Sequence, residues 1–290
     1  MKALRRSLVL LNSWSLIPRV LFFLVLCSPA QAAWDYSLGL GGRTLPQGGA
    51  LSGELGYGKI FWGEKTYTGY KYGYLRPHAT VQTTVIWNRA DVGIDFFPIS
   101  FAGITAGYAE NFRQSQIDTI NCQAVMCQGV VDSPYVRAKL LLGAGAFALG
   151  FGSELDFLAP WDGSRVFADE SSALIGTQGG DTLWWNWVYG IYRFNDKFGV
   201  GPYFIAARML QQGSQNDSES IFFRYTEKNL TINVGAGVYE SDTRIRSFTA
   251  YATATLSVLP SVSLTLISAQ EQTPPNSLNS GCTLASIANS

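Results

Sequence analysis

The chain has 290 residues with 21 basic and 21 acidic side chains, and only 14% of its residues are charged. A typical soluble domain has about 25% charged residues. The balanced charge argues against a nucleic-acid-binding protein, and the 13% aromatic content argues against intrinsic disorder. Beyond the N-terminus, no run of roughly 18–20 apolar residues predicts a membrane-spanning helix. These features leave a β-protein, either soluble or embedded in a membrane.

The first 32 residues have the pattern of a removable export signal. Basic residues precede the apolar run 20–26, and the small-residue site 30–32 follows it, which predicts cleavage near Ala32. A signal anchor or a lipoprotein signal at Cys27 fits less well, because the run is too short to span a bilayer and Leu26 is bulky. We expect a signal peptide at 1–32, a barrel at 33–260, and a C-terminal segment at 261–290 that is either an extra strand or a flexible tail.

Export also bears on the cysteines. Cys122 and Cys127 lie in one polar stretch, and an oxidising compartment favours a short-loop disulfide between them. Free thiols or a metal site are the alternatives, but a metal needs more ligands than two thiols, and the single histidine, His78, is far away in the sequence. We expect no metal and no other cofactor, and Cys282 has no assigned role.

From residue 33 onward, apolar and polar residues alternate, which predicts strands with two unlike faces. In 248–258 the even positions are apolar, and the intervening positions are Thr, Tyr and Ser. Twelve strands are predicted, near 35–44, 50–62, 72–87, 89–97, 99–111, 133–142, 145–157, 182–194, 197–211, 219–226, 230–240 and 246–258. A segment at 262–269 is either a further strand or a returning tail. Ten or fourteen strands also fit the even number that such barrels require.

The predicted connections alternate between tight and long. Tight ones lie near 97–99, 142–145, 194–198 and 227–229, whereas 112–132, 158–181, 212–219 and 241–246 are longer and polar. The segment 63–71 and a tight bend at 87–89 are exceptions. Short turns on one side and longer loops on the other are typical of barrels in bacterial outer membranes. The two longest loops are candidates for surface recognition.

Residues 34–258 resemble bacterial outer-membrane β-barrel proteins as a broad, porin-like class. The resemblance rests on the signal, the alternation, the turn asymmetry and aromatic residues at strand ends that suit interfacial girdles. These aromatic residues are Trp62, Trp87, Phe97, Trp184, Trp185, Tyr192, Phe194, Phe198 and Tyr203. The core of a soluble β-sandwich is the alternative, but it would not need strands of ten residues.

The resemblance implies an all-β fold, a closed antiparallel transmembrane β-barrel of about twelve strands in the lipid bilayer of the cell outer membrane. One departure concerns the chain end. Many proteins of the class end with an aromatic residue on the last strand, whereas here the last aromatic residue is Tyr251 and the chain continues to Ser290.

The alternation also predicts a set of polar side chains that face the lumen, opposite the apolar positions. The set comprises Arg76, His78, Gln82, Arg89, Asp91, Asp95, Arg137, Lys139, Glu154 and Asp156. Side chains of both signs can constrict a pore and orient a polar solute. Alternatively, they can pair with one another, fill the interior and seal it.

We therefore expect passage of small polar solutes through the lumen, with a surface-interaction barrel that binds a partner through its long loops as the alternative. An outer-membrane hydrolase is a weaker hypothesis, because His78 is followed by Ala79 and Thr80 and the serine of a His-x-Ser pair is missing. We expect no enzyme activity and no nucleic-acid partner. The glycine clusters 39–42 and 143–152 precede no helix, so we expect them to let strands curve or approach closely rather than to bind phosphate.

Overall fold

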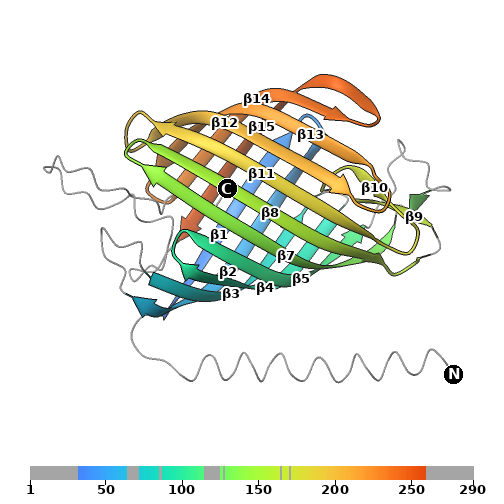
Figure 1. Ribbon diagram of the computed structural model, residues 1–290, viewed down its shortest axis with the longest axis horizontal. Coiled ribbons are helices and arrows are strands. Elements are labelled where there is room, and N and C mark those ends of the chain that lie inside the picture. Colours follow the sequence, from blue (N-terminus) through green and yellow to red (C-terminus); the bar gives the residue numbers. More distant parts are fainter. Residues whose placement is uncertain are drawn as a thin grey trace, which may run out of the picture. The chain divides into compact units, whose positions relative to one another are not determined.

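Alternating side chains place one face of each strand in contact with apolar surroundings and the other in contact with polar ones, and a sheet with two such faces can close on itself. The computed structural model describes residues 32–63, 72–84, 87–113, 125–126, 128–163, 165–169 and 171–258. In it, twelve strands form a closed antiparallel barrel (Figure 1). The ring is closed by the pairing of the first strand with the last, from Tyr36 opposite Val258 to Arg43 opposite Tyr251.

The twelve strands of the barrel follow one another in chain order, so each pairs with the next. They are β1 (Ala32–Arg43), β2 (Gly48–Gly63), β3 (Tyr72–Thr83), β4 (Trp87–Ile99), β5 (Ala102–Arg113), β7 (Gly129–Ala144), β8 (Phe147–Pro160), β11 (Asp181–Arg193), β12 (Phe198–Met209), β13 (Gln215–Glu227), β14 (Leu230–Ser241) and β15 (Arg244–Val258). All twelve predicted strands and the predicted fold class are confirmed. The signal segment, the extra strand at 262–269 and all four cysteines lie outside the described residues.

The outer face of the barrel is apolar. On β1, the exposed side chains are Trp34, Tyr36, Leu38 and Leu40, and the intervening residues are more buried. The other strands repeat this pattern, as at Val92, Ile94 and Phe96 on β4. Large apolar side chains that remain exposed at every second position need an apolar solvent, so they identify a lipid-facing surface. Within the described part of the chain, no helix is long and apolar enough to cross a membrane.

The ends of the barrel differ as the connection lengths predict. At one end, β4 and β5, β7 and β8, β11 and β12, and β13 and β14 are joined by two to four residues. Gly145 takes a φ of 58° in one of these turns, which favours glycine over residues with a Cβ. The two longest connections lie at the opposite end. The prediction of a longer loop at 241–246 was wrong, because β14 continues to Ser241 and β15 begins at Arg244, which leaves a turn of two residues.

The predicted aromatic girdle is only partly correct. Trp62, Trp184, Tyr192, Phe194 and Phe198 are exposed on the outer face. Trp87, Phe97, Trp185 and Tyr203 instead point into the barrel, where Trp87 and Phe97 are almost fully buried and the other two pack on buried apolar clusters. The physical reason is phase, because each of the four belongs to the alternate set opposite the exposed residues of its strand, such as Phe96, Trp184 and Phe204.

A second, smaller sheet forms from segments that the sequence predicted as loops. β6 (Val125–Met126), β9 (Val166–Asp169) and β10 (Leu174–Gly176) pair in the order β10-β9-β6, and we call them the cap sheet. Its strands come from the two longest connections, at the end of the barrel with the long loops (Figure 1). The alternation of apolar and polar residues did not predict these three short strands.

The two faces of β1 give a direct test of the fold. Leu38→Lys places a charge on the lipid-facing side and should lower the free energy of unfolding by about 2–4 kcal/mol. Ser37→Lys, one residue away on the inner face, should change it by ~0.5 kcal/mol or less. Urea unfolding of the protein in lipid vesicles, followed by heat-modifiable gel migration, measures both. Equal losses in the two variants would contradict the assigned faces.

Candidate functional site

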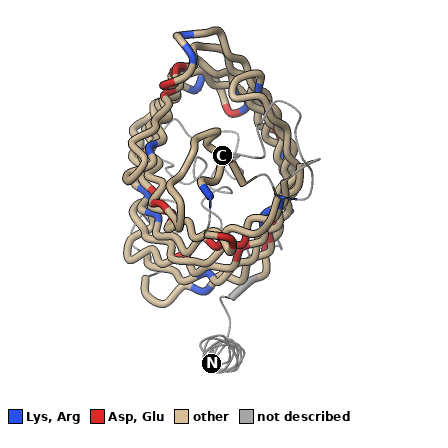
Figure 2. The backbone as a smooth tube through the Cα atoms, turned by 90° about the vertical axis from the view of Figure 1, so that its right-hand side faces the viewer, with Lys and Arg blue, Asp and Glu red and all other residues tan. Residues whose placement is uncertain are grey.

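The inner face of the barrel carries most of the ionisable residues that lie within strands. Figure 2 shows the strands as a ring with charged residues of both signs along its wall. The ten polar residues predicted to face the lumen all occupy positions opposite the exposed apolar ones.

Arg76 on β3 is the centre of one group. Its guanidinium pairs with Asp35 of β1 at 2.5 Å, with Glu54 of β2, and with Asp95 of β4 at 3.1 Å. The side chain of Arg76 is only 14% exposed. One arginine of β3 therefore links β1, β2 and β4 through ion pairs. Its buried charge would be costly to leave unpaired.

His78 lies next to this group, two residues along β3. Its Nδ1 is 3.4 Å from Asp95, and its Nε2 is 3.8 Å from Asp91 and 3.4 Å from the hydroxyl of Tyr135. Among the described residues, its recorded partners are thus two carboxylates and a phenol, and none is a serine or threonine hydroxyl. The contacts give no nucleophile for a histidine base, which a serine-type hydrolase requires.

Two further arginines flank Tyr135 of β7. Arg89 lies 5.6 Å and Arg137 5.4 Å from the centre of its ring, distances that allow cation–π attraction. Arg137 forms an ion pair with Glu154 of β8, whereas Arg89 is 3.8 Å from Asp91 and 3.7 Å from Asp156. Arg137 is therefore firmly paired, while the carboxylates near Arg89 are beyond hydrogen-bond length.

Gln82 and Lys139 share the inner face but stay outside these groups. Neither makes a hydrogen bond or ion pair with another described residue. Recorded ion pairs and hydrogen bonds thus connect eight of the ten predicted residues. Lys139 joins Arg89, Arg137 and Glu154 only in the lining of a cavity, and Gln82 stays apart. Asp35, Glu54 and Tyr135 were missed, although each occupies an inner-face position on its strand.

The inner-face ion pairs lie on one side of the barrel. In chain order around the ring they join β1, β2 and β4 to β3, β4 to β8, and β7 to β8. The Arg89–Asp156 pair spans two intervening strands, β5 and β7. In the part of the chain that the structure describes, no recorded inner-face ion pair connects this side to β11–β15.

Aromatic side chains also lie along the wall, in places that glycines leave free. A Cβ on Gly152 would lie 2.0 Å from the ring of Trp187, and one on Gly150 would lie 2.3 Å from the ring of Tyr189. Tyr135 occupies the same kind of space at Gly107. The glycine-rich segment 143–152 thus makes room for rings from the adjacent strand, as glycine within a strand often does where another group approaches closely.

A cavity of about 350 Å³ lies inside the barrel next to these rings. It is lined by the cations of Arg89, Arg137 and Lys139, by the carboxylate of Glu154, by Ser171 of the loop before β10, and by rings of β11 and β12. The ring-bearing residues are Trp185, Trp187, Tyr189 and Tyr203. Its volume is within the range of small-molecule sites.

The cap sheet is anchored to the barrel by arginines and an amide. Arg113, at the end of β5, donates to the carbonyl oxygens of Met126 and Ala168, both at 3.0 Å. Arg43 of β1 donates to the carbonyl of Ser171 at 2.6 Å, and Asn216 of β13 donates to that of Ser172.

Apolar contacts complete the anchoring. Phe167, which is fully buried, packs with Met126 and Leu174 of the cap sheet against apolar residues of β8, β11 and β12. Burying one such ring contributes about 1.5–3 kcal/mol. A hydrogen bond from a charged group contributes a similar amount. No single contact therefore holds the cap sheet alone.

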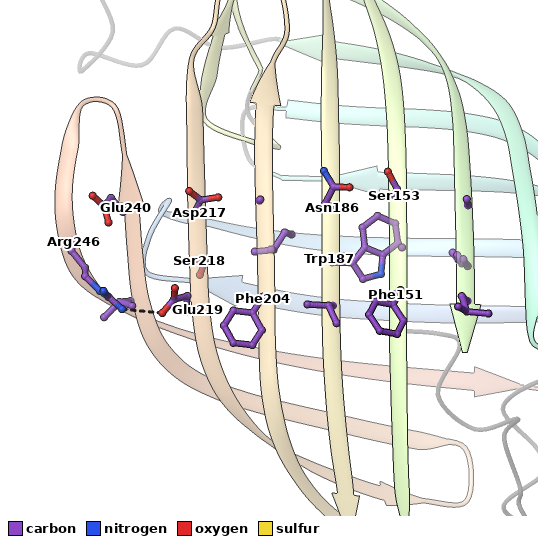
Figure 3. Close-up of a pocket in the computed structure, with 18 residues that line it drawn as sticks. Phe151, Ser153, Asn186, Trp187, Phe204, Asp217, Ser218, Glu219, Glu240 and Arg246 are labelled. Atoms are coloured by element: carbon purple, nitrogen blue, oxygen red, sulfur yellow. Dashed lines mark hydrogen bonds and ion pairs between the residues drawn. The ribbon is translucent and has the colours of Figure 1, made fainter. Parts of the chain in front are cut away.

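A larger hollow, of about 680 Å³, is a groove on the other side of the wall. Figure 3 shows Phe151 and Phe204 at this groove, with Glu219 and Arg246 joined by an ion pair of 2.8 Å. These side chains are exposed and share the lipid-facing phase of their strands. The lining of the groove is mostly of this phase, but Lys139 and Trp187 belong to the lining of both the groove and the inner cavity. Within the described residues no group of three or more His, Cys, Asp or Glu can hold a metal ion.

Fold, outer face and inner face together define a transmembrane β-barrel. No family model and no curated protein matches the chain. Similar solved structures include an outer-membrane channel from Pseudomonas putida F1 (8% identity, TM-score 0.44, covering 80% of this chain and 97% of that one). The NanC porin (12%, 0.41, 77% and 98%) and the KdgM porin (10%, 0.42, 77% and 98%) are also similar. All three are outer-membrane barrels, the broad class that the sequence resembles, and they single out no narrower family.

The position of the Trp187 ring predicts an effect on the lumen. Gly152→Ala puts a methyl group where the ring lies, so the ring must move off the wall, and the single-channel conductance should fall. Gly190→Ala is the matched control, because it lies on the outer face and its new methyl would meet nothing closer than 3.7 Å. Planar-bilayer recordings compare the two variants. Equal conductances would show that the ring does not border the conducting path.

Proposed function

We propose that the protein is a channel of the outer membrane that passes small polar solutes through a lumen narrowed by the cap sheet. The observation that carries the proposal is the lined cavity inside the barrel, together with the confinement of the recorded inner ion pairs to the β1–β8 side of the ring. A barrel sealed by its own charges would instead be bridged across the lumen.

The outer-membrane location rests on the lipid-facing exterior together with the export pattern of residues 1–32. In this orientation the cap sheet lies at the external mouth, because longer loops of such barrels are external. A cleaved signal near Ala32 and a disulfide between Cys122 and Cys127 belong to the same proposal. We propose no enzymatic role, and the partners of His78 offer no support for one.

The surface-interaction alternative depends on the long loops. Part of the 158–181 loop, at Val166–Asp169 and Leu174–Gly176, is committed to the cap sheet and packs on the barrel. That packing favours a role of this loop at the mouth of the channel over capture of a partner.

Conductance of the purified protein in planar bilayers tests the proposal. Folding is verified first by heat-modifiable gel migration. We expect discrete channel events from the folded protein. Folded protein without any events would exclude transport and leave the surface-interaction hypothesis.

Loosening the cap sheet should change the gating of the channel. Arg113→Met removes two charged hydrogen bonds to the cap sheet, together worth about 3–6 kcal/mol, so the ratio of a more open state to the closed state should rise at least about 100-fold. Arg208→Met removes the same charge near the same end of the barrel but from an exposed position on β12, and should leave gating unchanged. The fraction of time spent at the highest conductance measures both. Unchanged gating in Arg113→Met would separate the cap sheet from the control of passage.

A further inference from the structure

Lys139 is the one cation of the cavity without a described partner, and the sheet explains why. On β7 it pairs in register with Gly103 of β5 and Gly152 of β8. Both glycines are covered by rings, because the ring of Phe97 lies over Gly103 and that of Trp187 lies over Gly152. The two neighbouring strands therefore present no polar side chain to Lys139 at its own level.

Three carboxylates interact with Lys139 at longer range, Asp95, Glu54 and Glu154. Their recorded ion pairs are with arginines: Arg76 pairs with Asp95 and Glu54 as well as Asp35, and Arg137 pairs with Glu154. An ammonium that projects into the lumen without an ion pair has donors available for an oxygen acceptor that arrives from outside.

The cavity has an excess of one sign of charge. Arg89, Arg137 and Lys139 line it, and Glu154 is its one lining carboxylate. Glu154 forms an ion pair with Arg137, and Arg89 has two carboxylates within 4 Å, so Lys139 is the lining cation that has no described carboxylate within ion-pair distance. Its ammonium is the group that a carboxylate on a ligand in the cavity would meet.

The remaining lining suits a flat group. Trp185, Trp187 and Tyr189 alternate along β11, so their rings succeed one another on the same face of one strand. Aromatic faces attract other rings in offset or edge-on arrangements and contribute about 0.5–1.5 kcal/mol beyond the area that they bury. A ring that packs on Trp187 would bring a substituent close to the register position of Lys139.

We propose that this part of the lumen is a binding site for ring-bearing monocarboxylates, with Lys139 as the carboxylate partner and Trp187 as the platform for the ring. The site deepens the proposed channel function, on which its role in transport rests. The shared chemistry is a single carboxylate on a ring, which an aromatic acid and a sugar acid both provide.

Isothermal titration calorimetry of the whole protein in detergent tests the proposal without requiring conduction. Benzoate represents the aromatic acid and glucuronate the sugar acid, with benzyl alcohol and glucose as their uncharged counterparts. We expect at least one of the two acids to bind, and neither counterpart to do so at the same concentration. Binding of benzoate alone assigns an aromatic acid, binding of glucuronate alone assigns a sugar acid, and binding of both shows that the carboxylate dominates.

Substitution of Lys139 identifies the cation. Lys139→Met should weaken binding of the acid at least about tenfold, the effect of losing one charged hydrogen bond. Lys139→Arg should restore most of the binding, and Lys139→Gln replaces Lys139→Met if the latter does not fold. Lys197→Met, the same change in an exposed turn, should have no effect.

The outcomes separate this site from the channel itself. Absence of acid binding, or unchanged binding in Lys139→Met, overturns the site even if the protein conducts. Binding that depends on Lys139 in a protein without channel events supports the site and overturns the transport function instead.

Discussion

Hydrocarbon offers no hydrogen bond to a peptide group, and this constraint determines the architecture of the protein. Each backbone N–H and C=O within the bilayer must find its partner in the sheet, so the first and last strands have to meet. The pairing of β1 with β15 meets that requirement. Once the ring is closed, period-two alternation gives every strand a lipid-facing side and a lumen-facing side.

Once the ring is closed, side chains determine the shape of the interior. Two kinds of contact between strands, ion pairs and the packing of rings on glycines, fix their positions. Ion pairs such as those of Arg76 and Arg137 connect strands that are close in the ring. Rings such as Trp187 and Tyr189 lie over glycines of the adjacent strand. Inner-face rings of β3, β4, β11 and β13 also meet in one buried apolar cluster, which narrows the interior at that level. The cap sheet, in contrast, is brought in from the long loops and is held at the mouth by contacts with several strands.

The sequence was sufficient to predict the properties that depend on the alternation of apolar and polar residues along a strand. The twelve strands and the inner-face positions of residues such as Arg76 and Glu154 follow from alternation alone. The same phase would have placed Phe97 and Trp185 inside, and the girdle prediction failed because it weighed their nearness to strand ends instead. Properties that depend on the register between strands could not be predicted, because the residues around each position do not specify its partner on another strand. The contacts of Gly152 with Trp187 and of Asp35 with Arg76 are of this kind. The cap sheet was missed because strands of two to four residues are too short to show a period.

The central claim is that β15 has one side in lipid and the other in the aqueous lumen. Spin labels placed singly at residues 249–256, in protein whose other cysteines are replaced by serine, test it most directly. Oxygen, which partitions into lipid, should reach labels at positions 250, 252, 254 and 256, and a water-soluble nickel chelate should reach those at the intervening positions. Uniform exposure to the nickel chelate along the strand, or alternation in the opposite phase, would contradict the account.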